Sequence, residues 1–432
     1  MTEKIDFIVK RLQDHGFQTY WVGGAVRDML LQRTSGDIDI LTQATIPEIK
    51  SVFSDQKVRV VGKTFSVCIV NGIEVSPGRA GSDDADFPES DLARRDFTIN
   101  AMAFDPVSEK IIDPFNGRQD IQDRIIRFTQ DPLERIGEDP VRMVRACRFL
   151  ALMKGSFSLS TLEALQVSRS LLQEVAKERI GHEILKAMAL EKPSLFFSAL
   201  QTTGLLSYIF PSLDRCFGLG GGPHHGETVF DHCLLVGDAL PAKHPLMRLA
   251  GFLHDAGKFD AARLENKNLS FAGHEDHTRE VLKDMAALRF SVRDMDYINA
   301  LIKTHMRPLT PETTPRAARR LLSMLDRYGL SYREFMRMRI ADKKGNLAKT
   351  PYTLSDIRVR LKTLLAEIHR SSAFNINDLD ISGHEIAGLL NIPPSPEVGK
   401  IKEMLFEKVL DDPLLNRNEE LKKLCLSFQV KK

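Results

Sequence analysis

The run VGGAVRDMLLQRTSGDIDILT, residues 22–42, constrains the fold most, because strand, turn, helix and strand signals follow one another in it. An apolar segment that starts at Tyr20 ends in Gly23-Gly24, which predicts a tight turn. A helical pattern follows over residues 25–33, and a second strand is expected from Asp37 to Leu41. This order predicts a small α/β unit in which a glycine turn opens a helix.

The surrounding residues extend this unit. Residues 1–16 have the pattern of an amphipathic helix, with Ile5, Ile8 and Leu12 on one face. Strand-like runs follow at 57–61, 65–70 and 73–76, and Asn71-Gly72 is a hairpin signal between the last two. We therefore expect an α/β head over residues 1–130.

Helical periodicity dominates from Asp131 to the end of the chain. The run GLGGGP, residues 218–223, is the clearest flexible break in this helical part. The predicted fold class is α+β: the head is followed by a helical neck (131–217), a helical body (218–350) and a helical tail (351–432).

Composition narrows the class of protein. The chain has 432 residues, 43% hydrophobic and 27% charged, which suits two or more soluble domains. A net charge of +2 is too small to indicate a nucleic-acid-binding protein. Only local clusters of basic residues could indicate one. Five scattered cysteines without C-x-x-C spacing, a charged N-terminal segment and no long apolar run predict a cytoplasmic protein without a membrane partner.

Asp37 and Asp39 carry the clearest chemistry. Alternate residues of a strand point to one face, so both carboxylates can hold Mg²⁺, which prefers hard oxygen ligands. Gly23 and Gly24 offer backbone N–H groups to phosphates, and Arg27 can reach the same anion. Phosphoryl transfer from a nucleoside triphosphate needs these parts. A D-x-D pair alone is equally typical of a solvent-exposed strand edge. The full run of residues 22–42 favours phosphoryl transfer over this alternative.

This run resembles the signature of class II CCA-adding enzymes and bacterial poly(A) polymerases, within the nucleotidyltransferase superfamily. Further segments match in the family's order: Arg94-Arg95-Asp96 in LARRDFTINAMAFD, residues 113–127, EDPVRMVRACRF at 138–149, and ERIGHE at 178–183. The resemblance implies that the first segment grips ribose and triphosphate and that the third selects the nucleotide. It also implies that Glu178, Arg179 and Glu183 brace the selecting helix.

Asp139 and Arg142 are the predicted selecting pair, and three residues apart they are expected to share a helix face. A carboxylate that accepts from an exocyclic amine, beside a guanidinium that donates to the next ring nitrogen, matches cytosine and adenine. Guanine and uracil place an oxygen opposite the carboxylate, which leaves an acceptor facing an acceptor. An ordinary surface ion pair is the alternative. Arg145 and Arg148 are expected on the same side of this helix. They either bind substrate phosphates or remain exposed to solvent.

Three further expectations concern charged residues. Arg179 and Glu183, at i and i+4, are expected to form a structural salt bridge. Glu74 is a candidate third metal carboxylate beside Asp37 and Asp39, and an ordinary exposed strand residue is the alternative. Between Pro308 and Lys349 the chain has a local basic excess that can track an RNA backbone.

A second set of residues lies on successive predicted helices of the body: His232, His254-Asp255, His274, His305 and Asp342. Imidazole and carboxylate are ligands for divalent transition metals. The ordered set resembles the HD superfamily of metal-dependent phosphohydrolases, which implies a site for Ni²⁺ or Mn²⁺ and hydrolysis of phosphate esters. Lys258 lies near enough in sequence to assist with a phosphate, whereas His277 is expected to be an ordinary core or surface residue. A vestigial domain that only shapes an RNA-binding body is the alternative.

Three functions compete at this stage. The first is a template-independent tRNA nucleotidyltransferase that uses CTP, with or without ATP, on the tRNA 3′ end and acceptor arm. The second is a poly(A) polymerase, and the third is a metal-dependent phosphohydrolase with an RNA-binding head. The segment AGSDDADFPESDLA, residues 80–93, is short for a lever that switches the pocket from C to A, which favours addition of CC over full CCA.

Overall fold

The computed structural model describes residues 2–33, 38–62, 66–77, 86–222, 226–265, 268–308, 313–346 and 375–429, together with a few positions between 355 and 366. The chain divides into two compact units, residues 1–209 and 210–432. The predicted head and most of the predicted neck therefore belong to one unit, and residues 210–217 of the predicted neck belong to the other with the predicted body and tail. The described part of the chain contains no helix long and apolar enough to cross a membrane.

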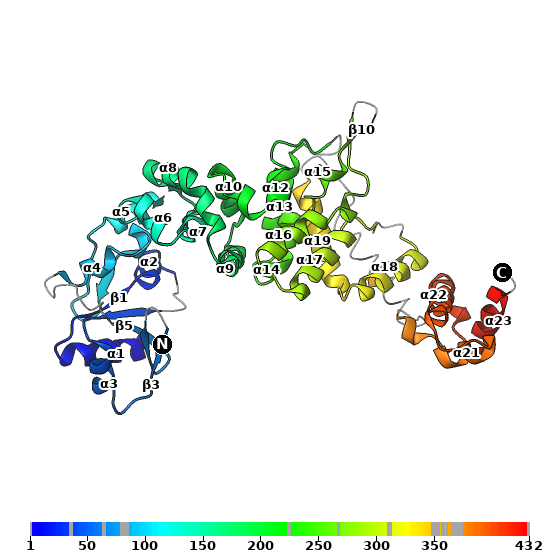
Figure 1. Ribbon diagram of the computed structural model, residues 1–432, viewed down its shortest axis with the longest axis horizontal. Helices are drawn as coiled ribbons and strands as arrows, with labels where there is room; N and C mark the ends of the chain where they lie inside the picture. Colours follow the sequence, from blue (N-terminus) through cyan, green and yellow to red (C-terminus); the bar gives the residue numbers. More distant parts are fainter. Residues whose placement is uncertain are drawn as a thin grey trace. The chain divides into compact units, whose positions relative to one another are not determined.

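A mixed sheet forms the centre of the head (Figure 1). Its strands, as described, lie in the order β3-β4-β5-β2-β1-β6-β7. Their bounds are Thr19–Val22 (β1), Asp39–Thr42 (β2), Val58–Val61 (β3), Val67–Val70 (β4), Ile73–Pro77 (β5), Ala103–Asp105 (β6) and Lys110–Ile112 (β7). Among the described strands of this sheet, β2 and β5 are the one parallel pair. This order brings β1, β2 and β5, which carry the predicted chemistry, to the middle of the sheet.

Short helices accompany the sheet: α1 (Thr2–Asp14), α2 (Gly24–Leu30), α3 (Ile46–Val52), α4 (Glu89–Leu92) and the 3₁₀ turn η2 (Thr98–Asn100). The apolar face predicted for α1 is confirmed, because Ile5, Ile8 and Leu12 are fully buried in one core with residues of β2, β4 and β5. The hairpin at Asn71-Gly72 is confirmed as well, since both residues have positive φ and β4 pairs with β5 antiparallel.

The rest of the first unit is helical, with one small two-stranded ladder. Its elements are α5 (Gly117–Asp123), β8 (Ile125–Ile126), α6 (Pro132–Glu138), α7 (Arg142–Met153), β9 (Ser156–Phe157), α8 (Leu159–Ser168), η3 (Arg169–Gln173), α9 (Lys177–Met188), α10 (Ser194–Thr202) and α11 (Leu206–Ile209). The central helix α7 packs against both α9 and α10. Arg145 of α7 binds Asp96 of the head, which brings α7 near the predicted triphosphate-binding residues.

The second unit is helical apart from a hairpin. Its body consists of α12 (Pro211–Asp214), α13 (Val229–Ala239), α14 (Pro245–Leu253), α15 (Lys258–Ala261), β10 (Arg263–Glu265), β11 (Asn268–Ser270), η4 (His274–Asp276), α16 (Arg279–Ala287), α17 (Val292–Thr304), α18 (Pro315–Arg327) and α19 (Tyr332–Gly345). Helices α13, α14, α17 and α19 pack on one another. These elements bear out the predicted α+β class.

The C-terminal helices form a small module with its own core, built from η5 (Ile376–Asp378), α21 (Gly383–Leu390), α22 (Pro396–Asp411), η6 (Pro413–Leu415) and α23 (Asn418–Gln429). Some of the basic residues that were predicted to track an RNA backbone bind this module instead. Arg316 and Arg320 on α18 bind the Asp411 carboxylate, and Arg319 donates to the carbonyl of Leu410. These arginines therefore hold α22 in the structure.

Candidate active site and candidate metal centre

The glycine turn before α2 brings the head's charged residues together. Gly23 has φ +70°, and a Cβ at this position would lie 2.7 Å from Arg95 Nη1 and 3.8 Å from Asp39 Oδ2. A Cβ there would make the Arg95 guanidinium shift, and the positive φ is a backbone conformation that side-chain-bearing residues rarely adopt, so this turn favours glycine. Asp39 begins β2, and Asp37 lies outside the described residues. Of the predicted acidic pair, the structure thus places Asp39 beside Arg95.

Strand register places Glu74 next to Asp39. In the parallel pair of β2 and β5, Ile40 lies opposite Val75, so the preceding residues Asp39 and Glu74 are neighbours as well. Side chains in register on adjacent strands point to the same face of a sheet. The head therefore presents carboxylates on two neighbouring strands, which are the hard oxygen ligands that Mg²⁺ prefers.

Arg27 has a different position from the one expected for an anion-binding residue. Its side chain is buried, Nη1 donates to Asn100 Oδ1 at 2.7 Å, and Nε donates to Asp28 Oδ1 at 2.9 Å. Its guanidinium also lies over the Phe149 ring, 5.2 Å from the centroid. Asn100 in turn donates to Asp96 at 2.9 Å. In the structure Arg27 supports the Asp96 segment and packs on α7.

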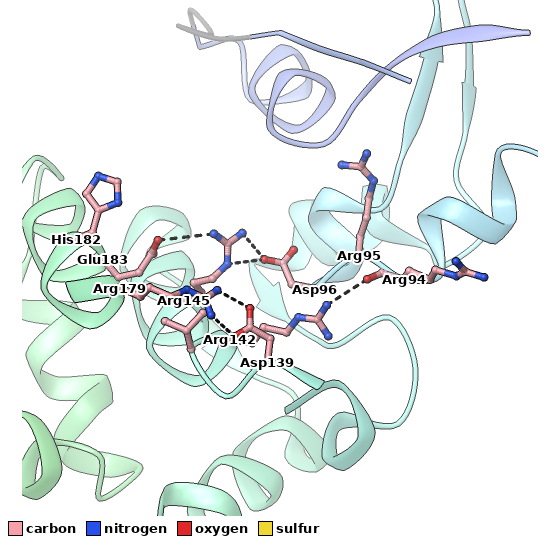
Figure 2. Close-up of a pocket in the computed structure, with 10 residues that line it drawn as sticks. Arg94, Arg95, Asp96, Asp139, Arg142, Arg145, Arg179, His182 and Glu183 are labelled. Carbon is pink, nitrogen blue, oxygen red and sulfur yellow. Dashed lines mark hydrogen bonds and ion pairs between the residues drawn. The ribbon is translucent and has the colours of Figure 1, made fainter. Parts of the chain in front are cut away.

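A pocket of about 350 Å³ lies where α7 and α9 meet the Arg94–Asp96 segment. Figure 2 shows its side chains converging from these elements. The lining residues are Arg94, Arg95, Asp96, Asp139, Val141, Arg142, Arg145, Arg179, His182 and Glu183. Three of the five segments that carried the family resemblance thus contribute to one cavity, and most of its lining residues are charged.

Asp139 and Arg142 line this pocket, but the shared helix face predicted for them is wrong. Asp139 ends α6 with extended backbone (φ −154°, ψ 92°), and α7 begins at Arg142. The reason is Pro140, because the residue before a proline is forced out of the helical region. Arg142 does not pair with Asp139 but binds Glu138 Oε2 at 2.8 Å and the backbone oxygen of Arg94 at 3.3 Å.

The predicted salt bridge between Arg179 and Glu183 is also wrong. Arg179 forms a bidentate pair with Asp139, with N–O distances of 2.9 and 2.7 Å (Figure 2). Glu183 is buried and binds Arg148, and its other oxygen lies 3.7 Å from Arg145. Glu178 is exposed at the start of α9. Of the predicted brace residues, Arg179 holds Asp139 and Glu183 holds the arginines of α7.

Arg145 and Arg148 are engaged with carboxylates rather than left solvated. Arg145 donates from Nε and Nη2 to Asp96 Oδ2, and Arg148 donates from Nε to Glu183 Oε2. Burial would raise the pKa of Asp96, but Arg145 and the Asn100 amide lower it below its ordinary value. Burial would likewise raise the pKa of Glu183, which Arg148 and Arg145 lower. Both carboxylates are therefore ionised: Asp96 joins the head segment to α7, and Glu183 joins α9 to α7.

Two supporting residues were not predicted from the sequence. Glu138 binds both Arg142 and Arg135, and its i, i+4 spacing to Arg142 was a usable signal. Asn100 connects Arg27 with Asp96, two segments that are far apart in sequence. No local pattern indicates such a contact.

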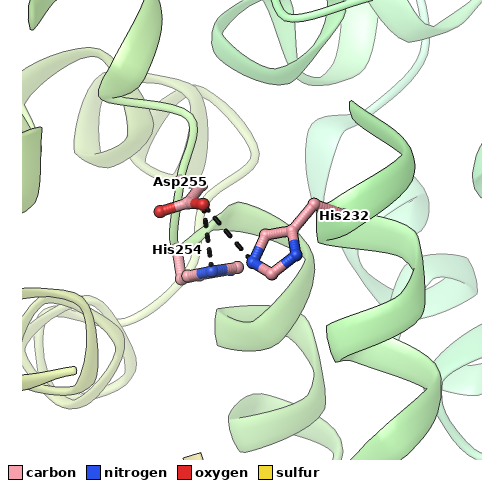
Figure 3. Close-up of side chains that lie close together, drawn as sticks. All are labelled: His232, His254 and Asp255. Carbon is pink, nitrogen blue, oxygen red and sulfur yellow. Dashed lines mark ion pairs between the residues drawn. The ribbon is translucent and has the colours of Figure 1, made fainter. Parts of the chain in front are cut away.

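In the second unit, all six predicted ligands meet at one centre. His232 comes from α13, His254 and Asp255 follow α14, His274 begins η4, His305 follows α17, and Asp342 lies on α19. Figure 3 shows the rings of His232 and His254 directed toward Asp255. Two groups, His232–His254–Asp255 and Asp255–His274–His305, each bring one ligand atom per residue within 4.8 Å of one another.

The distances between donor atoms fit a metal. Ligands about 2.1 Å from a metal ion lie roughly 3.0–3.4 Å from each other in octahedral or tetrahedral geometry. Asp255 Oδ2 lies 3.5 Å from His232 Nε2 and 3.3 Å from His254 Nε2. Asp255 Oδ1 lies 2.9 Å from His274 Nε2 and 3.5 Å from His305 Nε2, and Asp342 Oδ1 lies 3.2 Å from His232 Nε2.

Hydrogen bonds orient three of the rings for ligation. Nδ1 of His254, His274 and His305 faces the carbonyl oxygens of Gly251, Phe271 and Ile302, each three residues earlier. A carbonyl only accepts, so Nδ1 carries the proton and the neutral ring offers a lone pair at Nε2. Nε2 of His274 and Nε2 of His305 lie 3.3 Å apart, so two lone pairs face each other. A cation between such atoms removes this repulsion.

The charge beside Asp255 favours its ionised form. Lys258 is buried, and its Nζ lies 2.7 Å from Asp255 Oδ2. Burial would raise the pKa of Asp255, but the Lys258 ammonium holds it well below its ordinary value. His277, expected to be an ordinary core or surface residue, is exposed.

Comparison with known proteins agrees with the fold. Residues 19–127 match the family model of the poly A polymerase head domain. Residues 156–217 match the model described as the probable RNA and SrmB- binding site of polymerase A. The crystal structure of the Bacillus stearothermophilus CCA-adding enzyme in complex with CTP aligns with a TM-score of 0.66 at 22% identity, covering 98% of this chain and 96% of that one. The head and neck thus define the class as a nucleotidyltransferase fold.

Sequence relatives narrow this class. The CCA-adding enzyme of Anoxybacillus flavithermus (strain DSM 21510 / WK1) is 30% identical over 437 residues, which cover 98% of this chain and 96% of that protein. The chain therefore belongs to the family of class II CCA-adding enzymes and bacterial poly(A) polymerases. The CC-adding tRNA nucleotidyltransferase of Halalkalibacterium halodurans is 39% identical over 206 residues, 47% of this chain and 52% of that protein. Alignments with several other CCA-adding enzymes likewise span about half of those relatives' length.

Proposed function

We propose that the protein is a tRNA nucleotidyltransferase that adds C to the tRNA 3′ end from CTP without a nucleic-acid template. The observation that carries the proposal is the pocket, in which Asp139 and Arg142 line the same cavity as Arg94 and Arg95. Family membership and relatives named as CCA-adding and CC-adding enzymes support it. The proposed partners are the tRNA acceptor arm, CTP and, if full CCA is made, ATP. Five buried, unbridged cysteines suit the reducing cytoplasm.

Base selection follows from hydrogen-bond geometry. Arg179 takes one lone pair on each oxygen of Asp139, and each oxygen keeps a second lone pair. Asp139 can therefore accept from the amine of cytosine or adenine while Arg179 holds it in place. Arg142 supplies the neighbouring donor. A guanine or uracil oxygen would face this carboxylate without a proton between them, at a cost of about 1–3 kcal/mol per unpaired group.

The triphosphate has a cationic counterpart in Arg94 and Arg95 on the same side of the pocket. Arg95 lies against Gly23 and 3.4 Å from Asp91, so it is held between the glycine turn and α4. Asp39, with Asp37 and Glu74, would hold Mg²⁺, which neutralises charge on the transferring phosphoryl group when bound. The chain's own residues supply position and charge complementarity.

A direct assay tests this proposal. The purified protein would be incubated with a tRNA that lacks its 3′ CCA and with each nucleoside triphosphate alone. We expect incorporation from CTP and none from UTP or GTP, with Asp39→Ala as the inactive control. A long run of A from ATP alone would show a poly(A) polymerase instead, and no incorporation from any triphosphate would contradict the proposal.

We propose a second activity, metal-dependent hydrolysis of phosphate esters, at the histidine centre of the second unit. The observation that favours it is the convergence of four histidines and two carboxylates with metal-ligand spacing. Ni²⁺ or Mn²⁺ would be held by these residues and would activate water when bound. Lys258 adds a buried positive charge beside Asp255, which suits a phosphate substrate.

Hydrolysis of a 2′,3′-cyclic nucleotide in the presence of Mn²⁺ or Ni²⁺ tests the second activity. His254→Ala and Asp255→Ala should remove it and leave nucleotide addition unchanged, since the two sites lie in separate units. His277→Ala is the matched control, because His277 is an exposed histidine near the centre in sequence. A wild-type protein that neither takes up metal nor hydrolyses the substrate would show that this domain is only a scaffold.

A further inference from the structure

Glu227 lies beside the metal centre and contacts one of its histidines. Thr228 is the N-cap of α13, so Glu227 directly precedes the cap and His232 is the fourth residue of the helix. These two positions commonly hold an apolar pair that packs across a helix start. Here the pair is polar: Glu227 Oε1 lies 3.3 Å from His232 Nδ1, and the two side chains are 4% and 1% exposed.

The carboxylate is fixed from its other side. Glu227 Oε2 accepts from the backbone N–H of Gly226 at 3.1 Å. Thr228 Oγ1 accepts from the backbone N–H of Asp231 at 3.1 Å, which closes the first turn of α13. A carboxylate at this place is also favoured by the partial positive charge of the helix N-terminus. Glu227 is thereby held with one oxygen directed at the imidazole.

His232 differs in this respect from the other histidines of the centre. His254, His274 and His305 direct Nδ1 at backbone carbonyls. Nδ1 of His232 instead lies 3.3 Å from a side-chain carboxylate oxygen, Oε1 of Glu227. Glu227 is thus placed to provide for His232 the acceptor that the backbone provides for the others, and it adds a full negative charge.

We propose that Glu227 is a positioning residue of the metal centre. It keeps the proton of His232 on Nδ1, so that Nε2 points its lone pair at the position shared with His254, Asp255 and Asp342. This inference rests on the metal site proposed above. A ligating histidine whose other nitrogen donates to a carboxylate is held in one orientation and is a more basic ligand, and loss of such a partner typically lowers metal affinity about 10–100-fold.

Glu227→Gln tests the inference, because glutamine has the same shape and lacks the charge. Binding of Mn²⁺ alone to the full-length protein would be followed by electron paramagnetic resonance of the free ion. An Asp255→Asn chain would define binding elsewhere, including the head. We expect Glu227→Gln to raise the dissociation constant for Mn²⁺ about 10–100-fold. Its long-range proton–nitrogen spectrum should show His232 losing its preference for the Nδ1–H form.

Glu275→Gln is the matched control. Glu275 Oε2 lies 3.9 Å from His274 Nδ1, but that nitrogen is already bound to the Phe271 carbonyl at 2.9 Å. The same substitution there should change the dissociation constant less than twofold. Wild-type Mn²⁺ affinity in Glu227→Gln, or an equal loss in Glu275→Gln, would overturn the role of Glu227. No binding by the wild type beyond the Asp255→Asn level would overturn the metal site itself.

Discussion

Glu183 offers the sharpest test of how the neck supports the pocket. Its side chain is 6% exposed and its main partner, Arg148, is 11% exposed. Replacing it with alanine leaves the Arg148 guanidinium buried without its carboxylate, a change that costs about 3–5 kcal/mol in buried pairs. Arg145 keeps Asp96, so we expect the lower end, about 3 kcal/mol. In a unit of this size each kcal/mol lowers the melting temperature by about 2–4 °C, which predicts a loss of roughly 6–12 °C.

The single tryptophan makes this measurable. Trp21 lies in β1, so thermal unfolding followed by its fluorescence reports on the first unit of the full-length chain. Glu178→Ala is the matched control: the same substitution in the same helix, at an exposed position. It should lower stability by less than about 1 kcal/mol. A shift below 2 °C in Glu183→Ala, or equal shifts in both variants, would refute the reasoning.

Acid gives an independent check on the same carboxylate. The pKa of Glu183 is lowered in the folded protein, as burial is outweighed by Arg148 and Arg145. Its stabilisation is therefore present above the unfolded pKa of about 4.3 and is lost as the pH falls through the lower folded value. The melting temperature of the wild type should consequently fall more than that of Glu183→Ala between pH 5 and pH 3.

Two further predictions concern catalysis and selection. Asp39→Ala should reduce nucleotide addition to less than a tenth of wild type while leaving the Trp21 melting curve and tRNA binding intact, and a higher residual rate would contradict a metal-holding role. Asp139→Ala or Arg142→Ala should reduce discrimination against UTP and GTP more than it weakens triphosphate binding. Competition between mixed triphosphates measures this, and unchanged base preference in both variants would mean that they do not read the base.

The sequence predicted elements and residue sets better than it predicted pairings. The strands around Gly23 and the hairpin at Asn71-Gly72 follow from local turn chemistry and alternation, so short windows were sufficient. The six predicted ligands of the second unit were found because histidines and aspartates, distinctive residue types, recur in order on or directly after successive helical segments. Both predictions rest on short sequence windows or on residue type. The structure has these strands and brings these histidines and Asp255 together.

The pairings failed because tertiary context decides them. Spacing alone suggested that Asp139 faces Arg142, but Pro140 ends the helix between them and Arg179 takes the carboxylate. Arg27 has the position in sequence of an anion ligand, yet Asn100, more than seventy residues later, receives its guanidinium. A pair of charges on one helix has several partners within reach once other helices pack against it, and sequence spacing does not rank them.

The remaining prediction is addition of CC without A, and it depends on the segment 80–93. Switching from C to A requires the pocket to change shape, and a mobile segment that presses on the selecting residues is a physical way to do so. Residues 80–85 lie outside the described residues. The rest of the segment is anchored: Phe87 and Leu92 are buried in a core with Val22 and Leu41, and Asp91 pairs with Arg95.

An anchored segment leaves little length for a lever, so the pocket should stay in the state that accepts C. Relatives named as CCA-adding and as CC-adding enzymes both align with this chain. Sequence similarity alone therefore does not distinguish a CC product from a CCA product. A tRNA ending at its discriminator base would be incubated with CTP and ATP together, and the 3′ ends sequenced. We expect products that end in CC.

Since Phe87 anchors the segment, Phe87→Ala should loosen it without lengthening it, and the product should remain CC. Wild-type products ending mainly in CCA would refute the lever argument, because a segment this short would then suffice, or another part of the chain would reshape the pocket.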